Sequence, residues 1–256
     1  MYKQIWLKEI KGELYTWKST VWLLIAALLF SFTSYLLLTN KELTLLDQTE
    51  LLWLLSKVII GVGLLMVTID ASAIITSEFE HETAESLFLA PIKIKDFIFG
   101  KFLASLTLWF LIWLIAIPYM LVASAGSHLA FLFIAHVFLL GTLCITGFVF
   151  LIFAISLLYR SSKNTLTTAF IILLASAIPA LFASNLKSAN ILSTISAVNP
   201  LDNVFSSLDN VLVDYQISIS QNLKFILPLI VFCLLTFFLL VFASRRFRKQ
   251  GIIKNG

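Results

Sequence analysis

Residues 129–158, LAFLFIAHVFLLGTLCITGFVFLIFAISLL, form an apolar run without a single lysine, arginine, aspartate or glutamate. An α-helix rises about 1.5 Å per residue, so about 20 apolar residues are enough to cross the hydrocarbon of a bilayer. In the strands of a membrane β-barrel, apolar and polar residues would alternate, and here they do not. The run therefore predicts a membrane-spanning helix.

The rest of the chain repeats this pattern. Of its 256 residues, 60% are hydrophobic and 12% are charged, and the mean hydropathy is +0.99. Because soluble domains are about a quarter charged, a water-soluble domain is excluded. We predict an all-α integral membrane protein with six spans in a single transmembrane domain, residues 1–256. The spans are expected at about 20–39, 51–75, 97–124, 129–158, 165–184 and 223–244.

The distribution of lysine and arginine predicts the orientation. Fourteen of these residues lie at the N-terminus, after the second and fourth spans, and in the C-terminal tail, against three in the opposite loops. Cytoplasmic loops carry the excess of basic residues in membrane proteins, so both termini are expected in the cytoplasm. The first span is expected to stay as an uncleaved anchor.

Two segments outside the spans have amphipathic patterns. In residues 2–18, Trp6, Ile10 and Trp17 follow helical spacing, which predicts a helix in the membrane interface. An ordinary basic flank of the first span is the alternative. Residues 199–216 open with Asn199-Pro200 and predict a second amphipathic helix, on the outer side. Its expected polar face consists of Asp202, Asn203, Ser206, Asp209, Asn210 and Asp214.

The chain lacks a nucleotide-binding loop. Gly100-Lys101 is followed by Phe102 instead of serine or threonine, and Lys95 stands where the first glycine is needed. The chain is therefore not expected to hydrolyse ATP itself. Its basic residues lie beside the spans instead of on a soluble face, so no nucleic-acid partner is expected.

No metal site or cofactor is expected either. His81, Glu82 and Glu85 resemble the zinc-binding helix pattern, but its second histidine is missing. Cys144 and Cys233 both lie inside apolar runs and are expected to pack as reduced thiols.

Few ionisable residues fall inside the spans, and those that do are candidate polar sites. Asp70 is expected near the cytoplasmic end of the second span, and His136 lies in the fourth span, where it would hydrogen-bond across helices. Lys57 is expected near the outer end of the second span, where its side chain would reach the interface. None is expected at the membrane midplane, which argues against ion coupling.

Residues 78–91 carry the densest charge in the chain. The segment has good helix formers and no proline before Pro91, so we predict a short amphipathic helix between the second and third spans. Asp96 is expected to cap the third span. Acidic side chains are repelled by anionic lipid, and a protein partner would relieve that cost. The residues expected to dock it are Glu78, Glu80, His81, Glu82, Glu85, Leu87, Phe88 and Pro91.

This segment resembles the signature of ATP-binding-cassette type-2 transporter permeases. In that family, acidic residues, a Gly-Thr-Leu-Glu-like step, a leucine-rich turn and a proline precede Gly-Lys at the start of the third span. Glu82 stands where the family usually has glycine, which departs from the signature. The matching residues are Glu80-His81-Glu82-Thr83-Ala84-Glu85-Ser86-Leu87, Pro91 and Gly100-Lys101-Phe102-Leu103-Ala104.

The resemblance implies a permease subunit in a bacterial or archaeal cytoplasmic membrane. Two such subunits, as a homodimer or a paralogous heterodimer, would each dock a separate cytoplasmic ATPase through residues 78–91 and export a substrate. Because the spans lack midplane charge, an amphipathic or lipid-like cargo is favoured.

Two other classes of function remain open. The first is a membrane subunit that transmits force from a cytoplasmic ATPase to a periplasmic or surface partner, through the outer helix at 199–216. The second is an intramembrane enzyme, which needs two catalytic groups at matching depth, and the spans offer none.

Overall fold

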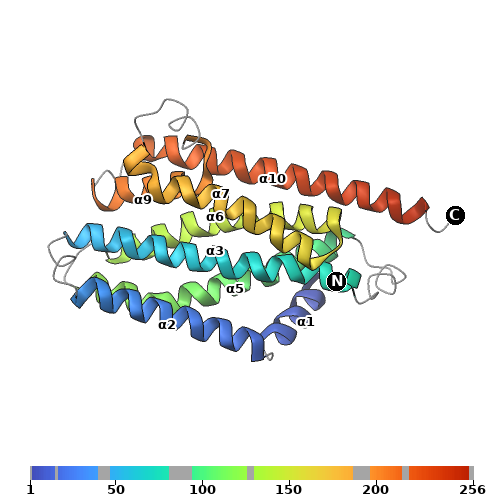
Figure 1. The fold of residues 1–256 in the computed structure, drawn as a ribbon, viewed down its shortest axis with the longest axis horizontal. Coiled ribbons are helices and arrows are strands. Elements are labelled where there is room, and N and C mark those ends of the chain that lie inside the picture. Colours follow the sequence, from blue (N-terminus) through green and yellow to red (C-terminus); the bar gives the residue numbers. More distant parts are fainter. Residues whose placement is uncertain are drawn as a thin grey trace.

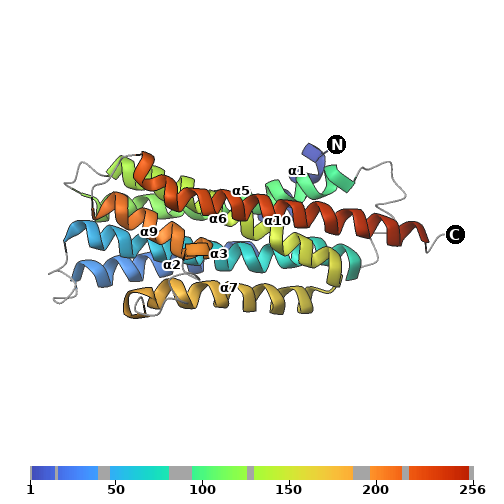
Figure 2. The same cartoon turned by 90° about the horizontal axis from the view of Figure 1, so that it is seen from above.

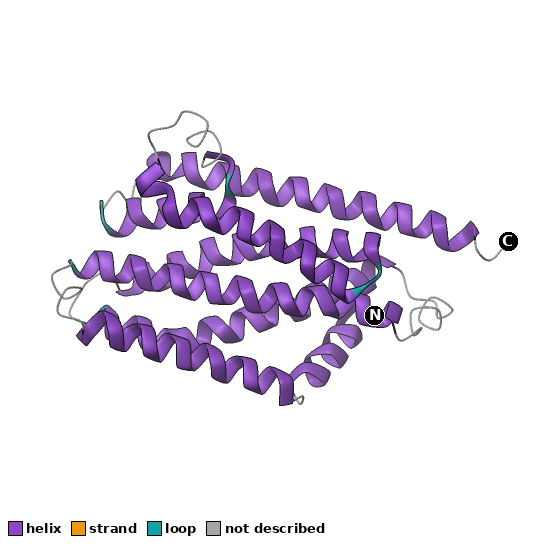
Figure 3. Cartoon of the chain, in the orientation of Figure 1, coloured by secondary structure: helices purple, strands orange, loops and turns teal. Residues whose placement is uncertain are grey.

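The structure is a computed structural model. It describes residues 2–14, 17–39, 47–80, 94–125, 130–186, 197–214 and 219–253. This part of the chain is helical and contains no strand (Figure 3). The helices are α1 (Tyr2–Leu14), α2 (Trp17–Thr39), α3 (Gln48–Glu80), α5 (Ile94–Ala123), α6 (Ala130–Tyr159), α7 (Ser162–Leu186), α9 (Pro200–Leu212) and α10 (Ile219–Ile253).

Six of these helices are long and apolar enough to cross a membrane, and they lie side by side along the molecule (Figures 1 and 2). The predicted all-α membrane protein with six spans is confirmed. The membrane-spanning stretches are Thr20–Thr39, Gln48–Glu80, Ile94–Ala123, Ala130–Tyr159, Ser162–Ala180 and Asn222–Phe247.

α3 and α6 form the centre of the bundle. In their most apolar stretches 61% of the residues are buried, against 17–28% in the other spans. The indole of Trp109 on α5 is fully buried between them, and its Nε1 donates to Thr142 Oγ1 at 2.9 Å. Gly63 of α3 and Gly141 of α6 face this indole, and a Cβ on either would overlap it. The two glycines therefore allow the bulkiest side chain of the core to sit at the junction of three helices.

α9 lies at one end of the bundle, where it contacts α3, α6, α7 and α10 (Figure 2). It begins as predicted, because Asn199 Oδ1 accepts from the backbone N–H of Leu201 and Pro200 follows the cap. Two residues assigned to its polar face, Asn203 and Asn210, are buried instead. Asn203 Nδ2 donates to the carbonyl oxygens of Ala197 and Asn199, both at 2.9 Å, and Asn210 Nδ2 donates to Asn222 Oδ1 at 3.1 Å. Hydrogen bonds thus offset the cost of burying these amides.

At the opposite end, which we call the Glu80 end, lie α1, the last turn of α3, the start of α5 and the C-terminal part of α10 (Figure 1). α1 lies obliquely across this end and ends at Leu14, before the predicted limit of residue 18. Trp6 Nε1 donates to Thr107 Oγ1 on α5 at 3.1 Å, so this residue of the predicted lipid-facing stripe packs against protein.

Candidate functional site

The last turn of α3 contacts several helices through three consecutive residues, Glu78, Phe79 and Glu80. We call these residues the α3 terminus. They are the first residues of the predicted segment 78–91, but they continue the long helix from Gln48 and do not start a new one. The helix extends past the apolar run, and each of the three side chains has a partner on another helix.

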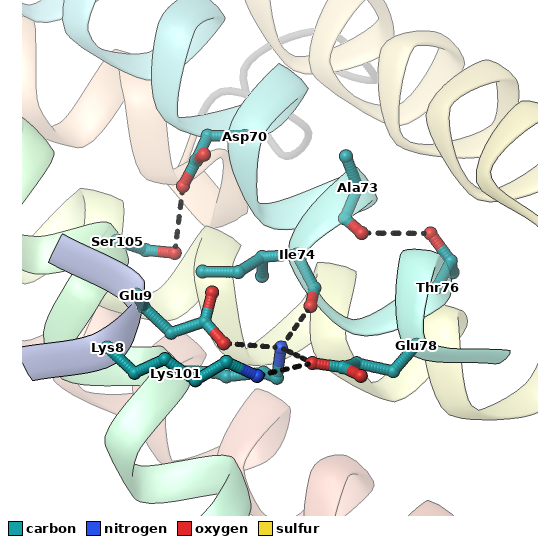
Figure 4. A network of polar contacts seen from close by, with 9 residues as sticks. All are labelled: Lys8, Glu9, Asp70, Ala73, Ile74, Thr76, Glu78, Lys101 and Ser105. Carbon is teal, nitrogen blue, oxygen red and sulfur yellow. Dashed lines mark hydrogen bonds and ion pairs between the residues drawn. The ribbon is translucent and has the colours of Figure 1, made fainter. Parts of the chain in front are cut away.

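Glu78 forms an ion pair with Lys101, which lies at the centre of a polar cluster (Figure 4). The side chain of Lys101 is only 1% exposed, although it is charged. Lys101 Nζ lies 3.0 Å from Glu9 Oε1 and 3.2 Å from Glu78 Oε1, and it donates to the carbonyl oxygen of Ile74 at 2.6 Å. Lys8 Nζ adds a longer ion pair with Glu78 Oε1 at 3.8 Å. This cluster ties α1, α3 and α5 together, and one buried ammonium has two carboxylates to compensate it.

Gly100 lets α1 come close enough to make this cluster. A Cβ at this position would lie 2.9 Å from Ile5 Cβ and 3.1 Å from the carbonyl oxygen of Tyr2. Tyr2 and Phe99 also pack edge to face, with ring centres 5.4 Å apart. The Gly100-Lys101 step therefore has two structural roles: the glycine admits α1, and the lysine binds it.

Glu80 connects the α3 terminus to the start of α7. Its Oε1 accepts from the backbone N–H of Ser162 at 2.7 Å, and its Oε2 accepts from Ser162 Oγ at 2.9 Å. Thr76 Oγ1 lies 2.6 Å from the same hydroxyl. Ser162 is the first residue of α7, so the carboxylate satisfies an otherwise unpaired N–H and meets the positive end of the helix dipole.

Phe79 connects the α3 terminus to α10. Its ring centre lies 5.4 Å from that of Phe247. The guanidinium of Arg160, in the two-residue link between α6 and α7, lies 5.0 Å from the same Phe247 ring. Arg160 has a φ of 55°, a left-handed conformation that turns the chain sharply at the end of α6.

Of the residues predicted to dock a partner, Glu78 is largely buried and pairs with Lys101, whereas Glu80 is exposed and binds Ser162 at the start of α7. His81, Glu82, Glu85, Leu87, Phe88 and Pro91 lie outside the described residues.

The predicted N-cap at Asp96 is wrong. α5 begins at Ile94, and Asp96 lies in its first turn, where a negative charge still favours the helix dipole.

Asp70 and His136 do not come together. Gly63 of α3 and Gly141 of α6 both face Trp109, so they lie at a similar depth in the bundle. Asp70 is seven residues from Gly63 toward the Glu80 end, and His136 is five residues from Gly141 toward the α9 end. At 1.5 Å per residue, this separates them by roughly 18 Å along the bundle. Asp70 Oδ2 accepts from Ser105 Oγ at 3.3 Å. His136 Nδ1 lies 3.0 Å from the carbonyl oxygen of Leu132, so the expected bond across helices is replaced by one within α6.

The other polar and thiol side chains predicted inside the spans contact aromatic rings or the backbone. Lys57 Nζ lies 3.3 Å from the centre of the Trp53 ring and 5.6 Å from that of Phe205 on α9. Cys144 and Cys233 are reduced, as predicted, and Cys233 Sγ donates to the carbonyl oxygen of Leu143 at 3.0 Å. Within the described residues, no group of three or more His, Cys, Asp or Glu side chains is arranged to hold a metal ion.

The ion cluster at Lys101 was missed by sequence reasoning. Glu9 lies 92 positions from Lys101, so only the shared end of the membrane relates them. A lysine at the first turns of a span, with acidic residues at the same end of two other helices, was the available signal.

Models of known protein families give no match to this chain, and neither do curated protein sequences.

Proposed function

We propose that this chain is the membrane-spanning subunit of an exporter of the ATP-binding-cassette type-2 kind, driven by a separate cytoplasmic ATPase. The observation that carries the proposal is the α3 terminus. It contacts α1, α5, α7 and α10, and the chain continues from it into residues 81–93, which include Glu82 and Glu85. The excess of lysine and arginine at this end favours a cytoplasmic location for it and for both chain termini. The bacterial or archaeal membrane is what the resemblance to the permease family implies.

In this proposal the ATPase docks on the segment that links Glu80 to Ile94. Closure of the ATPase displaces the segment, and the α3 terminus passes the displacement to the helices it holds. Coupling of this kind needs a rigid element that both sites bias, and ion pairs, a helix cap and an aromatic contact supply that rigidity. A second copy of the chain, identical or paralogous, completes the pathway. The apolar bundle favours an amphipathic cargo.

Charge reversal tests this docking. We expect Glu82→Lys with Glu85→Lys to abolish co-purification with the ATPase and leave membrane insertion unchanged. Asp47→Lys with Glu50→Lys makes the same charge change at the α9 end of α3, and this control should leave co-purification intact. Equal binding by both double variants would contradict the docking assignment.

A second candidate function is force transmission to a periplasmic or surface partner without export. The observation that favours it is α9, which contacts α3, α6, α7 and α10 at the end opposite the proposed ATPase. Co-purification of an outer partner that depends on ATP, together with ATPase activity that no cargo stimulates, would favour this function over export.

A further inference from the structure

The Glu80 end of the bundle has a groove over α6, between α7 and α10. At the other end α9 inserts between α7 and α10 and contacts α6, so that half of the gap is filled by protein. In the half toward Glu80 the gap encloses about 480 Å³. Its walls include Ile155 of α6, Ile172 of α7, and Leu239 and Ala243 of α10. This volume lies within the range of pockets that hold small molecules.

The length of this groove matches one leaflet of a bilayer. Its lining on α6 begins at Leu151 and ends at Tyr159, the last residue of the helix. Eight residues of helix rise about 12 Å. Half of the hydrocarbon thickness is about 15 Å. A single acyl chain of the leaflet at this end therefore fits the groove lengthwise.

The end of the groove at Tyr159 is polar and basic. Arg246 and Tyr159 line it there, and both are exposed. Arg160 lies close by, since its guanidinium packs on the ring of Phe247, which also lines the groove. No acidic side chain is among the described residues of the lining. An apolar channel that ends at arginine fits a molecule with a hydrocarbon tail and an anionic head.

We propose that this groove binds an anionic phospholipid, with an acyl chain between α7 and α10 and its phosphate at Arg246. The lipid fills the space between α7 and α10 at this end, as α9 fills it at the other end. In the orientation of the proposed function, this lipid belongs to the cytoplasmic leaflet. Through Phe247, the bound lipid also supports the ring that Phe79 of the α3 terminus contacts.

The test uses native mass spectrometry of the purified full-length chain, exchanged from detergent into dioleoyl-phosphatidylglycerol or dioleoyl-phosphatidylcholine. We expect phosphatidylglycerol to be retained in preference. Arg246→Gln should lower its retention about fivefold, the factor for one basic side chain at an anionic surface. Arg245→Gln is the matched control, because Arg245 is exposed and absent from the groove lining. Equal loss in the two variants would indicate general surface charge and overturn the proposal, as would equal retention of both lipids.

A second pair of variants tests the position of the acyl chain. Ile172→Trp should fill the groove and lower retention of both lipids, whereas Ile171→Trp, at a 62% exposed neighbour outside the lining, should not. Retention that Ile172→Trp leaves unchanged would contradict the placement. If Ile172→Trp instead changes only the oligomeric state, the groove belongs to a second copy of the chain and the lipid proposal fails.

Discussion

Replacing Lys101 by methionine should destabilise the bundle strongly. Methionine keeps an unbranched apolar side chain in a site where Lys101 is 1% exposed, and it removes only the ammonium. Three contacts disappear with it: the one to the carbonyl oxygen of Ile74 at 2.6 Å and those to Glu9 and Glu78 at 3.0 and 3.2 Å. Both carboxylates are then left without their main counter-charge.

The size of the effect follows from the burial of the two carboxylates. Removing one partner of a buried ion pair costs about 3–5 kcal/mol. The side chains of Glu9 and Glu78 are 15% and 12% exposed, so some water reaches them, and Lys8 stays 3.8 Å from Glu78. We therefore expect a loss of about 3 kcal/mol, the lower end of that range.

The assay is equilibrium unfolding in mixed micelles by titration with sodium dodecyl sulfate, followed by far-ultraviolet circular dichroism. Lys95→Met makes the same change at an exposed position of α5 and should cost less than about 0.5 kcal/mol. Adding Glu9→Gln and Glu78→Gln to Lys101→Met should recover most of the loss, since no buried charge then lacks a partner. Equal stability of Lys101→Met and Lys95→Met would refute the reasoning, and so would a triple variant less stable than the single one.

Three further changes test other contacts in the same assay. Gly63→Ala should cost about 1–3 kcal/mol because its Cβ would overlap the Trp109 indole, and Trp109→Phe in the same chain should reduce that cost. Gly100→Val should push α1 away from α5 at Ile5, measured as faster proteolysis of the N-terminal helix at unchanged bundle helicity. Glu80→Gln keeps the shape but loses the charge at the start of α7, and should cost about 1 kcal/mol, with a smaller cost in high salt.

The six spans could be predicted because hydrophobicity over about 20 residues is a local property of the sequence. The start of α9 could be predicted for a similar reason, since Asn199 caps the helix and Pro200 follows it directly. The ion cluster could not, because Lys101 and Glu9 are far apart in sequence. For the same reason, the span predicted from the apolar run ends at residue 75, whereas α3 continues to Glu80. Glu78 and Glu80 lie beyond the apolar run, yet both have partners on other helices.

Site-specific photo-crosslinking tests the central claim, the docking of a separate ATPase, most directly. A photo-crosslinking amino acid is placed at Glu85 or, as a control, at Val198, which is 71% exposed beside α9. We predict an adduct from position 85 alone, with a protein that carries a nucleotide-binding loop and hydrolyses ATP. Adducts with that protein from both positions, or from neither, would contradict the account.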